Sequence, residues 1–121
     1  MKHCFAILII LILLTSKESK AQKADSVYQG IASYYHLKFN GRKTSSGEKF
    51  NNDSLTAAHK YLPFGTKVKV TNLNTKEFVI VRVNDRLPKK SKRSIDLTQE
   101  AARRLGIIRK GLQKVELLVI D

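Results

Sequence analysis

The sequence has little of several residue types that mark whole classes of protein. Its 121 residues include one cysteine, two prolines and six glycines. So few glycines and prolines argue against a low-complexity chain. An apolar share of 42% is too high for intrinsic disorder, and the length allows one folded domain.

A long apolar segment is also lacking, because the longest run covers only residues 5–14 (FAILIILILL). Ten residues rise about 15 Å as a helix, half of a bilayer core, so we expect no stable membrane span. The basic start and the small residues Ser19 and Ala21 are typical of a secretory signal peptide cleaved between Ala21 and Gln22. A buried N-terminal helix is the alternative. The sequence therefore predicts a signal peptide at 1–21, a polar lead-in at 22–27 and one folded domain at 28–121.

Cysteine is missing from the chain that this cleavage would leave, because the one cysteine is Cys4. A lipid-bearing cysteine would follow the apolar run, so we expect no lipid anchor. The exported chain would enter an oxidising compartment without disulfides. Neither thiol chemistry nor a cysteine-bound metal is available to it.

Acidic residues are scarce, with 10 Asp and Glu against 23 Lys and Arg, a net charge of +13. Loss of residues 1–21 removes three Lys and one Glu and leaves +11. So large a charge on a small body favours anionic surroundings. Nucleic acid would be the first partner to consider inside the cell, but export argues against it. We expect anionic cell-wall polymers or membrane surfaces, in the periplasm, the cell envelope or outside the cell.

What is present is mainly strand-forming sequence. Thr98 and Gly106 are the expected cap and stop of one short helix, whereas residues 55–62 are ambiguous. Five or six strands and one helix fit a small closed or nearly closed β structure. β-branched and aromatic residues or two-residue alternation predict the strands, at 27–35, 66–73, 78–83, 94–97 and 115–120.

Three local features give sharper expectations. Gly30 suggests a bulge or bend in the first strand. The apolar run 78–83 (FVIVRV) is typical of a central strand buried on both faces. Residues 84–93 are expected to form a basic loop, in which Pro88 ends any strand.

Three polar side chains are candidates for chemistry: Glu48 in a glycine-containing loop, His59 after two alanines, and Asp85 where an apolar strand ends. Functional carboxylates often lie on loops held by a rigid sheet. Each also has an ordinary explanation, as a solvated Glu, a turn-forming Asp or a structural His. The histidines of the exported chain form no ligand motif, so we expect no metal and no cofactor. The sequence patterns alone predict a small, exported, basic, mainly β domain and no particular function.

Six segments in order resemble the rare lipoprotein A (RlpA) family, over about nine tenths of the exported chain. The most distinctive is 55–66 (LTAAHKYLPFGT); the others are 30–35 (GIASYY), 41–50 (GRKTSSGEKF), 68–73 (VKVTNL), 81–86 (VRVNDR) and 95–98 (IDLT). The resemblance implies a mainly β fold, a six-stranded double-psi β-barrel with one or two short helices. It also implies an endolytic lytic transglycosylase of the bacterial envelope. Such enzymes cleave peptidoglycan glycan strands between N-acetylmuramic acid and N-acetylglucosamine and leave 1,6-anhydro ends.

The family's motifs also imply roles for particular residues. Asp85 matches the aspartate expected to act first as general acid and then as base. Glu48 would stabilise positive charge on the sugar or assist proton transfer, and His59 would orient one of the carboxylates or bind sugar. Core packing is the alternative for the tyrosines, and a solvated loop for the cations at 86–93. Substrate contacts are expected from Tyr34, Tyr35, Arg42, Thr44, Asn84, Arg86 and Arg93.

The chain departs from the family pattern at three of these places. Tyr34 replaces a frequent Trp, His36 replaces a Gly, and Leu87 stands where a Gly would let the backbone approach a ligand. Two other functions stay open: a non-catalytic, expansin-like module that grips wall glycan, and a basic envelope domain that contacts acidic polymers or a protein. The pair Glu48 and Asp85 favours the enzyme, provided that both reach one groove. The oligomeric state does not follow from the sequence.

Overall fold

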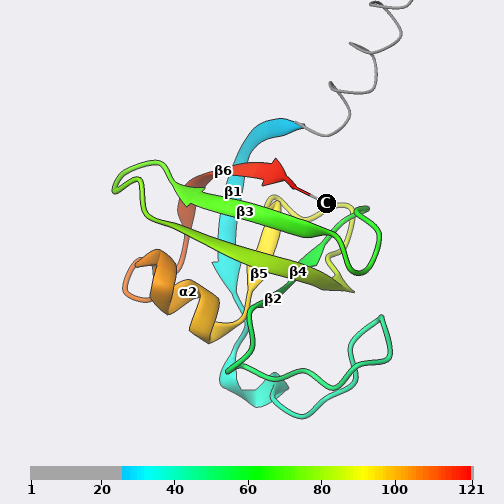
Figure 1. Ribbon diagram of the computed structural model, residues 1–121. Coiled ribbons are helices and arrows are strands. Elements are labelled where there is room, and N and C mark those ends of the chain that lie inside the picture. The colour runs from blue at the N-terminus through cyan, green and yellow to red at the C-terminus, as the bar shows by residue number, and fades with distance from the viewer. Residues whose placement is uncertain (1–25, 121) are drawn as a thin grey trace, which may run out of the picture.

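The computed structural model describes residues 26–120, in which six strands close into a barrel (Figure 1). The signal peptide predicted at residues 1–21 and its cleavage site lie outside the described residues. Around the barrel the strands follow the order β1-β5-β2-β4-β3-β6. Closure leaves no strand edge unpaired. The strands are β1 (Val27–Tyr34), β2 (Thr56–His59), β3 (Lys67–Asn72), β4 (Phe78–Arg86), β5 (Ile95–Leu97) and β6 (Gln113–Val119).

The barrel mixes parallel and antiparallel pairs. β1 pairs with β5 and β2 pairs with β4 in parallel, and the other four pairs are antiparallel. Alternate side chains of each strand point inward and form one core, in which the buried valines of β3 and β4 meet Val115 and Leu117 of β6. The mainly β barrel implied by the resemblance is therefore confirmed.

In the described part of the chain, two short helices accompany the barrel. α2 (Gln99–Leu105) has Thr98 as its N-cap, whose hydroxyl accepts a hydrogen bond from the Ala101 amide, and Gly106 as its C-cap, with a φ of 77°. A 3₁₀ helix, η1 (Leu37–Phe39), interrupts the long loop after β1, which extends from one end of the barrel (Figure 1). Within residues 26–120, no helix is long and apolar enough to cross a bilayer.

The expectation of a strand buried on both faces at 78–83 is wrong. Phe78 and Ile80 are 53% and 42% exposed, because only the alternate valines of β4 face the closed interior. β4 is also longer than expected. It continues through Arg86, so three residues assigned to the basic loop belong to a strand.

Gly30 marks a close approach and not a bulge. The pairing of β1 with β6 runs without a break from Val27 to Ala32. A Cβ at Gly30 would lie 2.2 Å from the Ser94 Oγ atom, so any side chain at this position would collide with the residue before β5. The ambiguous segment at 55–62 contains the short strand β2.

Candidate active site

A β-bulge gives Asp85 its direction. Along β2 and β4, Ala57 pairs with Val83 but the next residue, Ala58, pairs with Asp85. Asn84 is therefore an extra residue in β4. Without it, Asp85 would follow Val83 into the core, since side chains alternate along a strand. The extra residue reverses the alternation and turns Asp85 to the outer face of the barrel.

On that face a second carboxylate joins Asp85. Ala58 pairs with Asp85 on one side and with Asp96 of β5 on the other. Directly paired residues point to the same face of a sheet, so both carboxylates project outward, with their Cα atoms about 10 Å apart across two strand spacings. The methyl group of Ala58 lies between them and forms the floor of a hollow.

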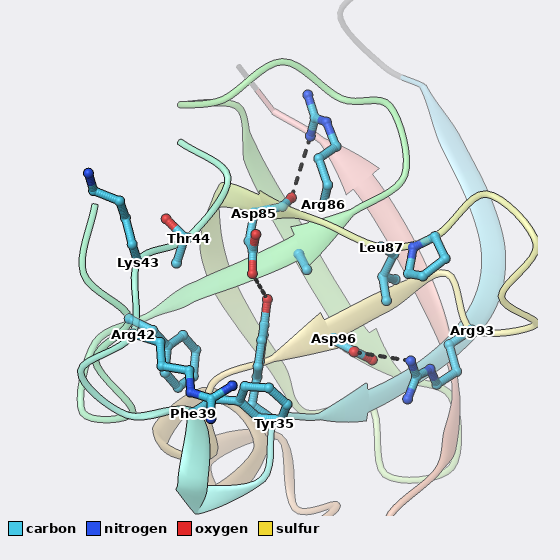
Figure 2. Close-up of a pocket in the computed structure, with 13 residues that line it drawn as sticks. Tyr35, Phe39, Arg42, Lys43, Thr44, Asp85, Arg86, Leu87, Arg93 and Asp96 are labelled. Atoms are coloured by element: carbon cyan, nitrogen blue, oxygen red, sulfur yellow. Dashed lines mark hydrogen bonds and ion pairs between the residues drawn. The ribbon is translucent and has the colours of Figure 1, made fainter. Parts of the chain in front are cut away.

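This hollow is a cavity of about 410 Å³ (Figure 2). Its walls come from β4, β5, η1 and the loops that follow β1 and β4. Four of the lining side chains are cationic and two are carboxylates, so an anionic or polyhydroxylated ligand fits its electrostatics better than a cation. The lining residues are Tyr35, Phe39, Arg42, Lys43, Thr44, Phe50, Ala58, Asp85, Arg86, Leu87, Pro88, Arg93 and Asp96.

Two donors hold the Asp85 carboxylate. The Tyr35 hydroxyl donates to Oδ2, as Figure 2 shows, and the Ser45 amide donates to Oδ1 over 2.9 Å. Burial raises the pKa of Asp85, but these hydrogen bonds and one from the Arg86 amide outweigh burial and hold that pKa below its usual value. Asp85 is therefore ionised at neutral pH in the ligand-free protein.

Glu48 lies beside this site but does not line the cavity. Its carboxylate accepts two hydrogen bonds from Arg82, of 2.7 and 2.9 Å, and a longer one of 3.5 Å from the Asn84 amide. The Arg82 hydrogen bonds lower the pKa of Glu48 against a smaller opposing influence of burial. The Ser46 amide also donates to the Asn84 carbonyl, at 3.2 Å. Glu48 thereby fastens its loop along β4, where the Ser45 amide meets Asp85.

His59 is buried, and both of its ring nitrogens have partners. The amides of Tyr61 and Leu62 both donate to Nδ1 over 3.2 Å, so the proton of the neutral ring is on Nε2, which contacts the Tyr28 hydroxyl. Burial, followed by the positive charges of Arg86 and Lys60, lowers the pKa of His59 to about 4. The ring is neutral at pH 7 and does not reach the cavity.

The residues expected to contact substrate fall into two groups. Tyr35, Arg42, Thr44, Arg86 and Arg93 line the cavity, and Arg93 also pairs with Asp96 at 3.4 Å. The other two lie off its lining, because the Tyr34 hydroxyl donates to the Ile108 carbonyl over 2.7 Å and Asn84 is buried in the bulge.

Asp96 is the main residue that sequence reasoning missed as a site residue. Its carboxylate accepts from the Ser33 hydroxyl and pairs with Arg93. A signal was present, since Asp96 is a charged residue between two apolar ones in a short strand. Leu87, a departure from the family pattern, contributes an apolar wall, and its amide donates to the His59 carbonyl at 3.3 Å. Among residues 26–120 no cluster of three metal-ligating side chains occurs.

Curated relatives share this region of sequence. The chain is 48% identical over 103 residues to the endolytic peptidoglycan transglycosylase RlpA of Haemophilus influenzae, a match that covers 85% of this chain and 36% of that protein. The protein of the same name from Pasteurella multocida is 50% identical over 109 residues, a match that covers 88% of this chain and 36% of that protein. A probable RlpA of Aquifex aeolicus is 45% identical over 108 residues, covering 89% of this chain and 48% of that protein. The chain thus spans between a third and a half of the length of these relatives.

Solved structures agree on the fold. An expansin of Clavibacter michiganensis superposes with a TM-score of 0.65 at 23% identity, over 79% of this chain and 51% of that one. A papain inhibitor of Streptomyces superposes with a TM-score of 0.63 at 20% identity, over 79% of this chain and 96% of that one. Because the sequence identity is so low, these two structures support only the assignment of the barrel fold. A family model described as lytic transglycolase matches residues 27–117, from the first residue of β1 into β6, and the chain therefore belongs to the lytic transglycolase family.

Proposed function

We propose that this protein is an endolytic peptidoglycan lytic transglycosylase that cuts glycan strands between N-acetylmuramic acid and N-acetylglucosamine. The observation that carries the proposal is the Asp85 cavity. A carboxylate held by two donors lies in an open, cationic hollow, within a sequence about half identical to RlpA proteins. We further propose that residues 1–21 direct export and that the protein acts in the cell envelope.

Cleavage of this kind needs one group that first gives and then takes a proton. In the proposed reaction Asp85 donates a proton to the leaving O4 atom as the C1–O4 bond breaks and positive charge develops at C1. The 6-hydroxyl of the same muramic acid then forms the C1–O6 bond and returns its proton to Asp85. No water is consumed, so no second base is required.

The ionised resting state of Asp85 has to change before the first step. Burial is the largest single influence on the pKa of this carboxyl, and it acts upward. A glycan that displaces water from the cavity removes more solvent from Asp85 and raises its pKa further. We therefore propose that Asp85 takes up its proton as the substrate binds.

The contacts of Glu48 and His59 support positioning roles in the proposed mechanism. Glu48 is engaged by Arg82 and fixes the loop whose Ser45 amide holds Asp85. The backbone carbonyl of His59 accepts from the Arg86 guanidinium at 3.4 Å and from the Leu87 amide, so it fixes the end of β4. Both residues would affect catalysis indirectly, because they hold the segments that position Asp85 and Arg86 and would not contact the substrate.

The proposal is tested by digesting purified sacculi with the protein and with three variants. The wild-type chain should release 1,6-anhydro-muropeptides detectable by mass spectrometry, and Asp85→Asn should release none. Glu48→Gln should be slower than wild type. Asp96→Asn is the matched control, because it removes the other carboxylate of the same cavity. Product from Asp85→Asn but none from Asp96→Asn would reassign the proton transfer to Asp96.

The second candidate, a glycan-binding module, has its own outcome in this experiment. Its support is the low pKa of Asp85, since a carboxylate that stays ionised suits binding better than acid catalysis. Wild-type protein that sediments with sacculi and releases no anhydro product at any pH would establish the module and reject the enzyme.

A further inference from the structure

The turn between β2 and β3 presents two aromatic side chains that the proposed reaction does not use. Tyr61 is 66% exposed and Phe64 is 43% exposed. Single exposed apolar residues are ordinary on protein surfaces. Two exposed aromatic rings on one short turn need a further explanation.

The turn that carries these rings is fixed. The amides of Tyr61 and Leu62 donate to the buried His59 ring, and the edge of that ring meets Tyr61 at 4.8 Å between ring centroids. At the other end of the turn the Gly65 amide donates to the Val83 carbonyl over 2.8 Å. A turn that is held from both β2 and β4 loses little conformational entropy when a ligand binds, which favours a recognition surface.

Arg86 joins Phe64 to the Asp85 cavity. Its guanidinium lies over the Phe64 ring, with 4.2 Å from Cζ to the ring centroid, and Arg86 is also part of the cavity lining. In Figure 2 the Arg86 side chain points away from Tyr35 and Phe39, which lie on the other side of Asp85. The wall of the cavity thus continues past Asp85 onto Phe64.

We propose that Tyr61, Phe64 and Arg86, which we name the aromatic shelf, form an additional glycan subsite beyond the Asp85 cavity. The inference rests on the proposed function. Pyranose rings present faces of C–H groups that pack on aromatic rings, and aromatic side chains supply large contact areas at low entropic cost. The guanidinium beside Phe64 suits a sugar that carries a carboxylate, as muramic acid does. The shelf takes a pyranose of the same strand that passes through the cavity.

The experiment compares glycan binding and turnover for Tyr61→Ala/Phe64→Ala with those for Phe78→Ala. Phe78 is a matched control, because it is 53% exposed and has Lys69 Nζ at 4.4 Å from its ring centroid. It starts β4, seven residues before Asp85, which is about 23 Å along a strand. Long glycan strands and short fragments that fill only the cavity serve as two substrates. Circular dichroism checks that each variant is folded.

We expect the double variant to bind long strands about tenfold more weakly, as two lost aromatic contacts imply. The loss should appear in KM rather than in kcat, and it should be much smaller for short fragments. Phe64→Tyr and Tyr61→Phe should retain binding, whereas Phe78→Ala should match wild type.

Wild-type cleavage together with unchanged KM in the double variant would overturn the shelf and leave the proposed function standing. A wild-type protein that neither binds nor cuts glycan would overturn both. Self-association or protein binding that the double variant abolishes, with glycan affinity unchanged, would assign the shelf to a protein partner and overturn the glycan subsite.

Discussion

Asp85 faces the cavity because β4 contains one extra residue, Asn84, that has no partner in the neighbouring strand β2. Its carboxylate is then held by Tyr35 and the Ser45 amide. These contacts come from segments 40 to 50 residues away in the chain. They determine the resting charge of Asp85.

Replacing Tyr35 with Phe should raise the pKa of Asp85, because it removes a hydrogen bond that favours the ionised carboxylate. The Ser45 amide remains as a donor. A carboxyl-carbon NMR titration measures the shift. Tyr34→Phe is the control, because the Tyr34 hydroxyl bonds to Ile108 instead. An unchanged Asp85 titration in Tyr35→Phe would contradict this account.

His59 should make the stability of the fold depend on pH. Its pKa is about 4 in the folded protein against 6.5 for an ordinary His, so the unfolded chain binds the proton more readily. Stability should be complete above about pH 6.5 and should fall by about 3 kcal/mol as the pH drops to about 4. Urea unfolding across this range measures the loss.

One variant separates His59 from other titrating groups. His59→Gln should flatten the dependence of stability on pH between pH 4 and 6.5. Carboxylates with lowered pKa, such as Asp85 and Glu48, lose their stabilising contribution at more acid pH. A His59→Gln variant that kept the full slope would show that the histidine is not its source.

At the residue scale, resemblance pointed to Asp85, Glu48 and His59. The structure places Asp85 in the lining of the cavity and the side chains of the other two outside it. The direction of Asp85 was not predictable from alternation, because the apolar pattern of β4 would send residue 85 inward. Asp96 was missed because its closeness to Asp85 depends on the order of three strands. Nothing along the chain encodes that order locally.

At the element scale, the pairing of β1 with its neighbours depends on the missing side chain at Gly30. Gly30→Ala should destabilise the fold by about 1–3 kcal/mol, the usual cost of overpacking, because the new Cβ would meet Ser94 at 2.2 Å. Chemical denaturation measures the change. Ser94→Gly in the same chain should recover part of the loss, since it removes the colliding atoms. Additive losses in the double variant would refute the collision.

The strand predictions succeeded for β1, β3, β5, β6 and most of β4, and they missed β2 and the end of β4. β3, the helix and its two caps follow local patterns and are confirmed. β2 has only four residues, all buried, so no alternation distinguishes it. The end of β4 (Asn84, Asp85, Arg86) is polar and lay in the expected loop, yet pairing with β2 makes it a strand.

At the scale of the whole molecule, the charge of +13 and the cationic lining of the cavity predict salt-dependent attraction to the anionic cell wall. Binding of the Asp85→Asn variant to sacculi should weaken several-fold between low salt and about 0.5 M salt, because exposed charges are screened. Co-sedimentation measures it, with carboxyl-amidated sacculi as the control that lacks the anionic charge. Binding that changed with neither salt nor amidation would show that electrostatic attraction does not hold the protein on the cell wall.

The most direct test of the central claim is digestion of sacculi in water enriched in ¹⁸O, followed by mass spectrometry of the released muropeptides. Attack by the sugar's own 6-hydroxyl predicts 1,6-anhydro products that carry no ¹⁸O, formed by the wild-type chain and absent with Asp85→Asn. Reducing ends labelled with ¹⁸O would mean that water is the nucleophile. That result would contradict the proposed transglycosylase mechanism.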